Sequence, residues 1–196
     1  MKTMLMFWAA VLCLSLNSSP GLAQKRAQLL FQKGQTDLFM QVGILPTYLI
    51  DKAKIVLPPV GLRAEHRFGK QYSLGVEAAH SVSQKTDFFV PTEEVREYQN
   101  TSYFFGLRNS VHCDCRRTEN IDLYGGFSLG YTLTYIEVLN GTFGPPEWQR
   151  DIRPRRGSFT YSGFLGVRYA CGPWLSLSGE IGFGVSLVQL GVGIKI

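Results

Sequence analysis

The chain ends in the stretch SLVQLGVGIKI, residues 186–196, whose side chains alternate between two kinds. Apolar residues stand at every second position from Val188 to Ile196. The alternate positions hold Leu187, which precedes Val188, and then Gln189, Gly191, Gly193 and Lys195. Because successive side chains of a strand point to opposite faces, this pattern predicts a β-strand with one apolar face and one small or polar face.

The same alternation recurs along the chain and is broken at Gly, Pro, Asn or charged clusters. In Ile121–Tyr135, for example, the odd positions are mostly apolar, and the even positions begin with Asp122 and then hold small or polar residues. We expect eight strands, at about residues 37–46, 55–68, 71–82, 101–112, 120–137, 157–170, 174–182 and 185–196. An even number of antiparallel strands is what a closed bacterial barrel requires.

Two places in the pattern predict local irregularity. The apolar parity changes from odd at Ile181 to even at Val188, so we expect a turn at Gly182 and Gly184, because side-chain parity cannot flip within a regular strand. Pro58 and Pro59 cannot donate to a strand ladder. The regular part of the second strand should therefore begin near Val60.

The charged residues distinguish a soluble barrel from a membrane barrel. A soluble barrel, such as a lipocalin, turns its apolar face inward, whereas a membrane barrel does the reverse. Nine charged residues share the less apolar face: Arg63, Glu65, Arg67, Glu77, Arg108, Asp122, Arg168, Glu180 and Lys195. The other face is nearly free of formal charge, and a lipid-facing Arg or Lys at the bilayer midplane costs about 2–4 kcal/mol. The sequence thus favours a transmembrane barrel whose lumen is closed by paired charges.

Aromatic residues and loop lengths predict the orientation. Phe68, Tyr72 and Tyr169 should lie at the periplasmic end, and Tyr103, Tyr135, Phe159 and Tyr161 at the outer end, as two interfacial belts. Connections at the periplasmic end are short, whereas 83–100 and 138–156 at the outer end are long. Short periplasmic turns and long outer loops are typical of outer-membrane barrels.

The first 23 residues have the pattern of an export signal. Lys2 precedes an apolar run from Met4 to Leu16, and small residues occupy the −3 and −1 positions of a cut after Ala23. A membrane anchor is the alternative, although this run is shorter than the ~20 residues of a spanning helix. We expect a signal peptide at 1–23, a short periplasmic segment at 24–36 and a barrel at 37–196.

Composition supports one exported domain. The 196 residues are 45% hydrophobic and 18% charged, and removal of Lys2 lowers the formal net charge from +5 to +4. This small excess is spread along the chain, so nucleic acid is not expected as a partner.

These strands resemble the eight-stranded outer-membrane barrels of the OmpX and OmpA transmembrane type, over residues 37–196. The stretch Val188–Ile196 is similar to the C-terminal signal that the barrel-assembly machinery reads, although Ile196 stands where that family has an aromatic residue. The resemblance implies an all-β, antiparallel up-and-down transmembrane barrel in the bacterial outer membrane, in contact with lipid, lipopolysaccharide and the assembly machinery.

Three groups of residues suggest chemistry. His80, Ser81 and Ser83 would be the start of a lipid-modifying site, and the alternative is an interfacial histidine beside loop serines. His112, Cys113, Asp114 and Cys115 contain metal-ligand types, but one C-x-C without a second cluster is a weak signal. A disulfide of Cys113 or Cys115 with Cys171 is a further reading, and unpaired thiols are another. No cofactor, metal or catalytic residue is assigned.

A basic outer loop suggests phosphate recognition. Trp148, Arg150, Arg153, Arg155 and Arg156 would contact lipopolysaccharide phosphate, since guanidinium groups bind phosphate in a bidentate manner. A solvated loop is the alternative, as is pairing with the acidic stretch 87–97 across the barrel mouth.

The predicted function is a structural or surface-interaction barrel, because eight strands enclose only enough space for their own side chains. A small passive porin-like channel is the second prediction and a lipid-modifying envelope enzyme the third.

Overall fold

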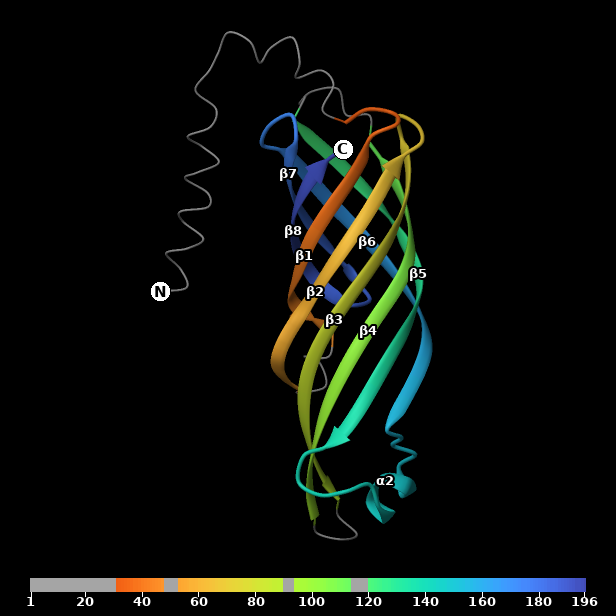
Figure 1. The fold of residues 1–196 in the computed structure, drawn as a ribbon, viewed down its shortest axis with the longest axis vertical. Coiled ribbons are helices and arrows are strands. Elements are labelled where there is room, and N and C mark those ends of the chain that lie inside the picture. Colours follow the sequence, from red (N-terminus) through yellow and green to blue (C-terminus); the bar gives the residue numbers. More distant parts are fainter. Residues whose placement is uncertain (1–30, 48–52, 90–93, 114–119) are drawn as a thin grey trace, which may run out of the picture.

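In a computed structural model the chain forms one closed antiparallel barrel in which each strand pairs with its sequence neighbours (Figure 1). The structure describes residues 31–47, 53–89, 94–113 and 120–196. The strands are β1 (Thr36–Pro46), β2 (Lys54–Arg67), β3 (Tyr72–Phe89), β4 (Glu94–His112), β5 (Ile121–Val138), β6 (Arg155–Ala170), β7 (Leu175–Phe183) and β8 (Ser186–Lys195). Pairing of β1 with β8, with Asp37 opposite Lys195, closes the barrel. The predicted eight-stranded fold is therefore confirmed, whereas the signal peptide at 1–23 lies outside the described residues.

Two strands are longer than the sequence pattern predicts. β3 continues to Phe89 and β4 begins at Glu94, with Lys85 opposite Tyr98, so most of the predicted outer loop 83–100 is strand. The prediction was wrong because polar residues such as Gln84 and Glu97 are typical of loops. Beyond the membrane a hairpin carries such residues at no cost, since water solvates both of its faces.

The predicted irregularities are present. The β2–β3 register shifts between Ile55 and Leu57 and again between Leu57 and Val60, so the regular ladder begins at Val60, after the two prolines. The β7–β8 hairpin turns at Gly184, whose φ of +130° lies in the region that glycine tolerates and other residues rarely adopt. Gly182, also predicted in the turn, is instead part of β7 and pairs with Phe164.

The barrel is uneven in height. β2 pairs with β3 only as far as Gln84, and β7 meets β6 only from Gly163. The ends of β3, β4, β5 and β6 at the bottom of Figure 1 therefore extend past their neighbours as a four-stranded sheet, which we call the projecting sheet. The short helix α2 (Pro145–Gln149) lies in the connection between β5 and β6, at the same end. We call this end the outer end, and the end that holds Ile196 the inner end.

Side chains on the two faces of the barrel wall differ in kind. Outward positions hold exposed apolar residues, among them Met40 (70% exposed), Leu62 (62%), Leu107 (69%) and Leu165 (65%). Inward positions hold Asp37, Arg63, Glu65, Arg67, Arg108, Asp122, Arg168 and Glu180, none more than 6% exposed. Water would not favour such an exterior, but hydrocarbon does. The barrel is therefore built to span a lipid bilayer.

Exposed aromatic side chains border this apolar exterior at both ends. Phe68, Tyr72, Tyr169 and Trp174 lie at the inner end, and Tyr103, Tyr135, Phe159 and Tyr161 at the outer end. Rings of this kind favour the lipid–water interfaces, so the two belts mark the limits of the bilayer. Among the described residues no helix is both long and apolar enough to cross a membrane.

Candidate functional site in the barrel interior

Among the described residues, the barrel interior holds ten charged side chains whose formal charges cancel. The cations are Arg63, Arg67, Arg108, Arg168 and Lys195, and the anions are Asp37, Glu65, Glu77, Asp122 and Glu180. Each strand contributes through the alternation of its side chains, which sends every second residue inward. Nine of these residues follow from the sequence pattern, whereas Asp37, at the very start of β1, was missed.

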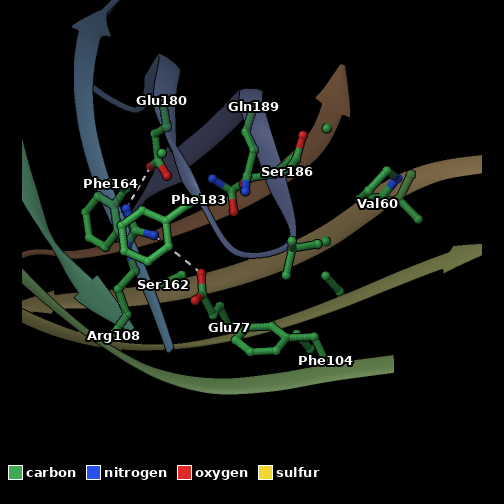
Figure 2. Close-up of a pocket in the computed structure, with 18 of the residues that line it drawn as sticks. Val60, Glu77, Phe104, Arg108, Ser162, Phe164, Glu180, Phe183, Ser186 and Gln189 are labelled. Carbon is green, nitrogen blue, oxygen red and sulfur yellow. Dashed lines mark hydrogen bonds and ion pairs between the residues drawn. The ribbon is translucent and has the colours of Figure 1, made fainter. Parts of the chain in front are cut away.

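The part of this network nearer the outer end is centred on Glu180. Its carboxylate accepts hydrogen bonds from Arg63, from Nη2 of Arg108 at 2.9 Å and from the Tyr124 hydroxyl at 2.6 Å. Arg108 also pairs with Glu77 at 3.4 Å, as Figure 2 shows. One carboxylate therefore joins side chains from β2, β4, β5 and β7 across the lumen.

Aromatic rings cover the arginine faces. The Arg108 guanidinium lies 3.3 Å from the centre of the Phe164 ring, and Arg63 lies 4.4 Å from that of Phe39. Arg168 is placed between Phe39 at 4.7 Å and Tyr124 at 5.0 Å. Cation–π contacts strengthen when desolvated. The rings stabilise the charges of these three arginines, although their Nε–H donors have no hydrogen-bond partner in the described part of the chain.

The other part of the network lies nearer the inner end of the barrel. Arg168 donates to Asp37 at 2.5 Å and to Glu65 at 3.0 Å, and Arg67 donates to Asp122 at 2.6 Å. Removal of one partner from such a buried pair leaves an uncompensated charge. The two parts together close the lumen with balanced ion pairs.

His112 joins Ser73 and Asp122 in the order of a catalytic relay. Its Nδ1 lies 2.8 Å from Asp122 Oδ2 and its Nε2 lies 2.7 Å from Ser73 Oγ. However, Ser73 donates its hydroxyl to Glu65, and Ser73, His112 and Asp122 are 2%, 3% and 5% exposed. A nucleophile must meet its substrate, so this cluster serves as a buried polar network.

Phe31 closes the inner mouth of the barrel. Its ring lies 4.4 Å from Nζ of Lys195, and its carbonyl oxygen accepts from Nη1 of Arg67 at 2.9 Å. The Gly34 N–H donates to the Arg67 carbonyl at 2.7 Å. The end of the predicted periplasmic segment therefore folds across the mouth.

A small cavity lies on the outer side of the Glu180 cluster. Its volume is about 40 Å³, and Glu77, Phe104, Arg108, Ser162, Phe164 and Gln189 are among the residues that line it (Figure 2). One buried water needs roughly 10–15 Å³, so about three waters fill such a space.

A second buried carboxylate holds the outer loop. Glu147 of α2 is fully buried and accepts from the Tyr98 hydroxyl at 2.9 Å and the Gly144 N–H at 2.8 Å, and Arg96 lies 3.8 Å away. Burial alone would raise the pKa of Glu147, but these hydrogen bonds and the Arg96 charge lower it below its ordinary value. We call this group the α2 latch. It joins the loop to β4 through a carboxylate of the loop and a guanidinium of β4, whereas the sequence suggested pairing of basic loop residues with the acidic stretch 87–97.

The five residues of the predicted lipopolysaccharide loop are dispersed. Trp148 is exposed on α2, Arg150 donates to the Phe88 carbonyl at 3.4 Å, and Arg153 pairs with Asp151 at 2.9 Å. Arg155 lies over the outward Tyr135 ring at 5.6 Å, whereas Arg156, one residue on, belongs to the opposite face of β6. Lipopolysaccharide contact stays a prediction, and Arg155 is the member on the lipid-facing side.

The other candidates are separated by the strand alternation. His80 faces outward and stacks on Tyr103 at 4.6 Å, while Ser81 and Ser83 are buried on the inward face. A histidine cannot activate a serine across the barrel wall. Cys113 is disulfide-bonded, but not to Cys171, so the predicted bridge to Cys171 is wrong; Asp114 and Cys115 lie outside the described residues.

Comparison with known proteins gives a likeness of fold. No protein-family model matches the chain, and no curated protein matches it in sequence. The N-terminal β-barrel domain of OprF from Pseudomonas aeruginosa is 10% identical, with a TM-score of 0.51 over 84% of this chain and 98% of that one. The outer membrane protein OprG from the same organism is 13% identical, with a TM-score of 0.55 over 84% and 97%. The fold is thus that of the eight-stranded outer-membrane barrels, as the sequence resemblance implied.

Proposed function

We propose that this protein is an integral barrel of the bacterial outer membrane that acts as a structural or surface-interaction element and not as a conduit. The observation that carries the proposal is the contrast between a lumen filled by ion pairs and a sheet that rises beyond the membrane. The first prevents transport through the barrel. The second presents protein surface outside it.

The closed lumen argues against a channel. Glu180 links four strands, Phe164 and Phe39 cover the arginines, and Phe31 lies across the inner mouth. Opening a path would break several buried pairs, each costing about 3–5 kcal/mol when one partner is lost. An open state that separates several of these pairs at once is therefore only rarely populated.

The projecting sheet supports an interaction role. The stretch 155–162 of β6 extends beyond the last β7 partner, Phe183, and so one of its edges has no neighbouring strand in the described part of the chain. An unpaired strand edge offers backbone N–H and C=O groups to an added strand. An extended segment of another protein is therefore the partner that this edge fits.

Two further partners follow from the same placement. The apolar exterior contacts membrane lipid, including lipopolysaccharide, and Arg155 is positioned to meet the phosphate of a lipid headgroup. The C-terminal strand β8, which resembles an assembly signal, would be read by the barrel-assembly machinery before it pairs with β1. No observation in the described part of the chain favours an enzymatic role.

Conductance and surface proteolysis test the proposal together. A matched variant replaces residues 86–97 and 135–155 each by a two-residue turn, which shortens the projecting sheet and keeps all eight strands. We expect no unit currents from either protein in planar bilayers. In proteoliposomes trypsin should cut the full chain within its β5–β6 connection, at Arg150, and the shortened variant should give no such fragments. Reproducible unit currents, or an uncut full chain, would contradict the proposal.

A further inference from the structure

A groove on the lipid-facing side lies at the outer limit of the apolar exterior, between β4 and β5. Its volume is about 500 Å³, and it is lined by Thr101, Tyr103, Phe105, Leu133, Tyr135 and Glu137. Strand order places Phe105 and Leu133 toward the middle of the membrane, the two tyrosines at the interface, and Thr101 and Glu137 beyond it. The groove therefore runs from hydrocarbon to the headgroup region.

Two opposite charges flank the end of this groove that is farther from the middle of the membrane. Glu137 and Arg155 are exposed on the outward face, and Arg155 stands opposite Tyr135, two positions before Glu137. They do not form an ion pair with each other, and in the described part of the chain neither has a charged partner. Both charges are thus available to a ligand.

An aromatic row supports the groove from both sides. His80 stacks on Tyr103 at 4.6 Å, Tyr103 meets Tyr135 edge to face at 6.2 Å, and Arg155 lies over Tyr135 at 5.6 Å. Side chains locked by such packing hold their neighbours in place. The Arg155 guanidinium is therefore held beside the groove.

We propose that this groove binds a phospholipid with a phosphoethanolamine headgroup. Arg155 takes the phosphate, Glu137 takes the ammonium, and one acyl chain lies along Phe105 and Leu133. This inference rests on the proposed membrane placement and deepens it by naming a lipid class.

Charge complementarity selects that headgroup over others. A purely anionic headgroup would meet the Glu137 carboxylate, and a lone cation would meet Arg155. A primary ammonium donates N–H bonds to the Glu137 carboxylate and the Thr101 hydroxyl, which a trimethylammonium cannot. Ethanolamine is therefore preferred to choline.

Native mass spectrometry of the full chain with lipid tests the inference. The purified barrel is offered equal amounts of dioleoyl phosphatidylethanolamine, phosphatidylcholine and phosphatidylglycerol, with lipid A in a separate arm. We expect phosphatidylethanolamine to bind about tenfold more tightly than the other two phospholipids, which corresponds to ~1.4 kcal/mol. Lipid A should not displace it at equal concentration.

Three variants separate the roles. Glu137→Gln should remove the preference for phosphatidylethanolamine over phosphatidylglycerol, and Arg155→Gln should weaken both. Arg153→Gln, which removes the same charge from the loop, should change neither. All three positions are exposed, and the heat-dependent gel mobility of the barrel verifies that each variant is folded.

Equal binding of the three phospholipids, displacement by lipid A, or an unchanged preference in Glu137→Gln would overturn the inference. If the barrel inserts into bilayers but shows no preference, this inference alone fails. If it does not insert, the proposed function fails as well.

Discussion

Strand β4 passes through two environments, and its residues change accordingly. Within the membrane its inward positions hold Arg108, Ser110 and His112, while Leu107 and Phe105 face outward. In the projecting sheet the outward positions become Gln99 and Glu97. The backbone and the alternation are the same in both regions. The difference shows that the solvent on each face, and not the strand itself, decides which residues it carries.

The inward face also changes along the barrel. The membrane-embedded part has ten charges, whereas the next rows toward the outer end hold hydroxyl pairs, such as Ser102–Thr134 at 3.0 Å and Thr132–Thr160 at 2.7 Å. Neutral hydroxyls suffice where water has access. Ion pairs that cross the lumen are needed where the barrel must be filled and each charge must be neutralised.

The largest effect should follow from loss of the Glu180 charge. Glu180→Gln leaves Arg63 and Arg108 without their shared carboxylate, so we expect a loss of about 3–5 kcal/mol in the free energy of unfolding. Urea unfolding of the barrel in lipid vesicles measures this. The matched change in the outer region, Glu137→Gln, should cost less than about 0.5 kcal/mol. Similar losses at both positions would remove the distinction between the two regions.

The second largest effect should follow from a charge placed on the outward face, which should lower the free energy of unfolding in the membrane-embedded region and not in the projecting sheet. Leu107→Arg puts a guanidinium at membrane depth and should destabilise the barrel by about 2–4 kcal/mol. Val95→Arg, on the outward face of the projecting sheet, should be nearly neutral, within about 0.5 kcal/mol. The same unfolding assay compares them. An Arg at position 107 that is tolerated as well as one at 95 would mean that Leu107 does not face lipid.

The smallest effect concerns the α2 latch and depends on pH. Because the folded-state pKa of Glu147 is below its ordinary value of 4.5, the latch is fully stabilised above that value and loses stability as the pH falls through the lowered pKa. In a background with Trp8→Phe and Trp174→Phe, Trp148 fluorescence should report loop release on acidification while the barrel stays folded. Glu147→Gln should abolish this pH dependence. A signal that titrates equally in both proteins would assign it to another group.

The sequence predicts the membrane-embedded region better than the projecting sheet. Alternation under two different solvents is a strong local signal, and it located β5, β6, β7 and β8 to within two residues. In the projecting sheet both faces meet water, so the alternation fades, and Gln84 and Glu97 were assigned to a loop. The strands there depend on pairing between segments, which a single chain pattern does not display.

The candidate site shows the same division. Nine interior charges follow from their parity, and the excess of five cations over four anions signals the missing partner, Asp37. The α2 latch gives no such signal, because Tyr98 and Glu147 are 49 residues apart and their contact arises only in the folded loop. The groove at Tyr103 and Tyr135 likewise requires the register of β4 and β5.

Quenching of tryptophan by brominated lipid chains tests most directly which face of the barrel meets hydrocarbon. With Trp8, Trp148 and Trp174 replaced by Phe, a single tryptophan is placed outward at Leu107→Trp or inward at Phe164→Trp. Strong quenching of Leu107→Trp and weak quenching of Phe164→Trp is the result we expect. The reverse pattern, or quenching of Leu107→Trp only by a water-soluble quencher, would contradict an apolar exterior in lipid around an ionic interior.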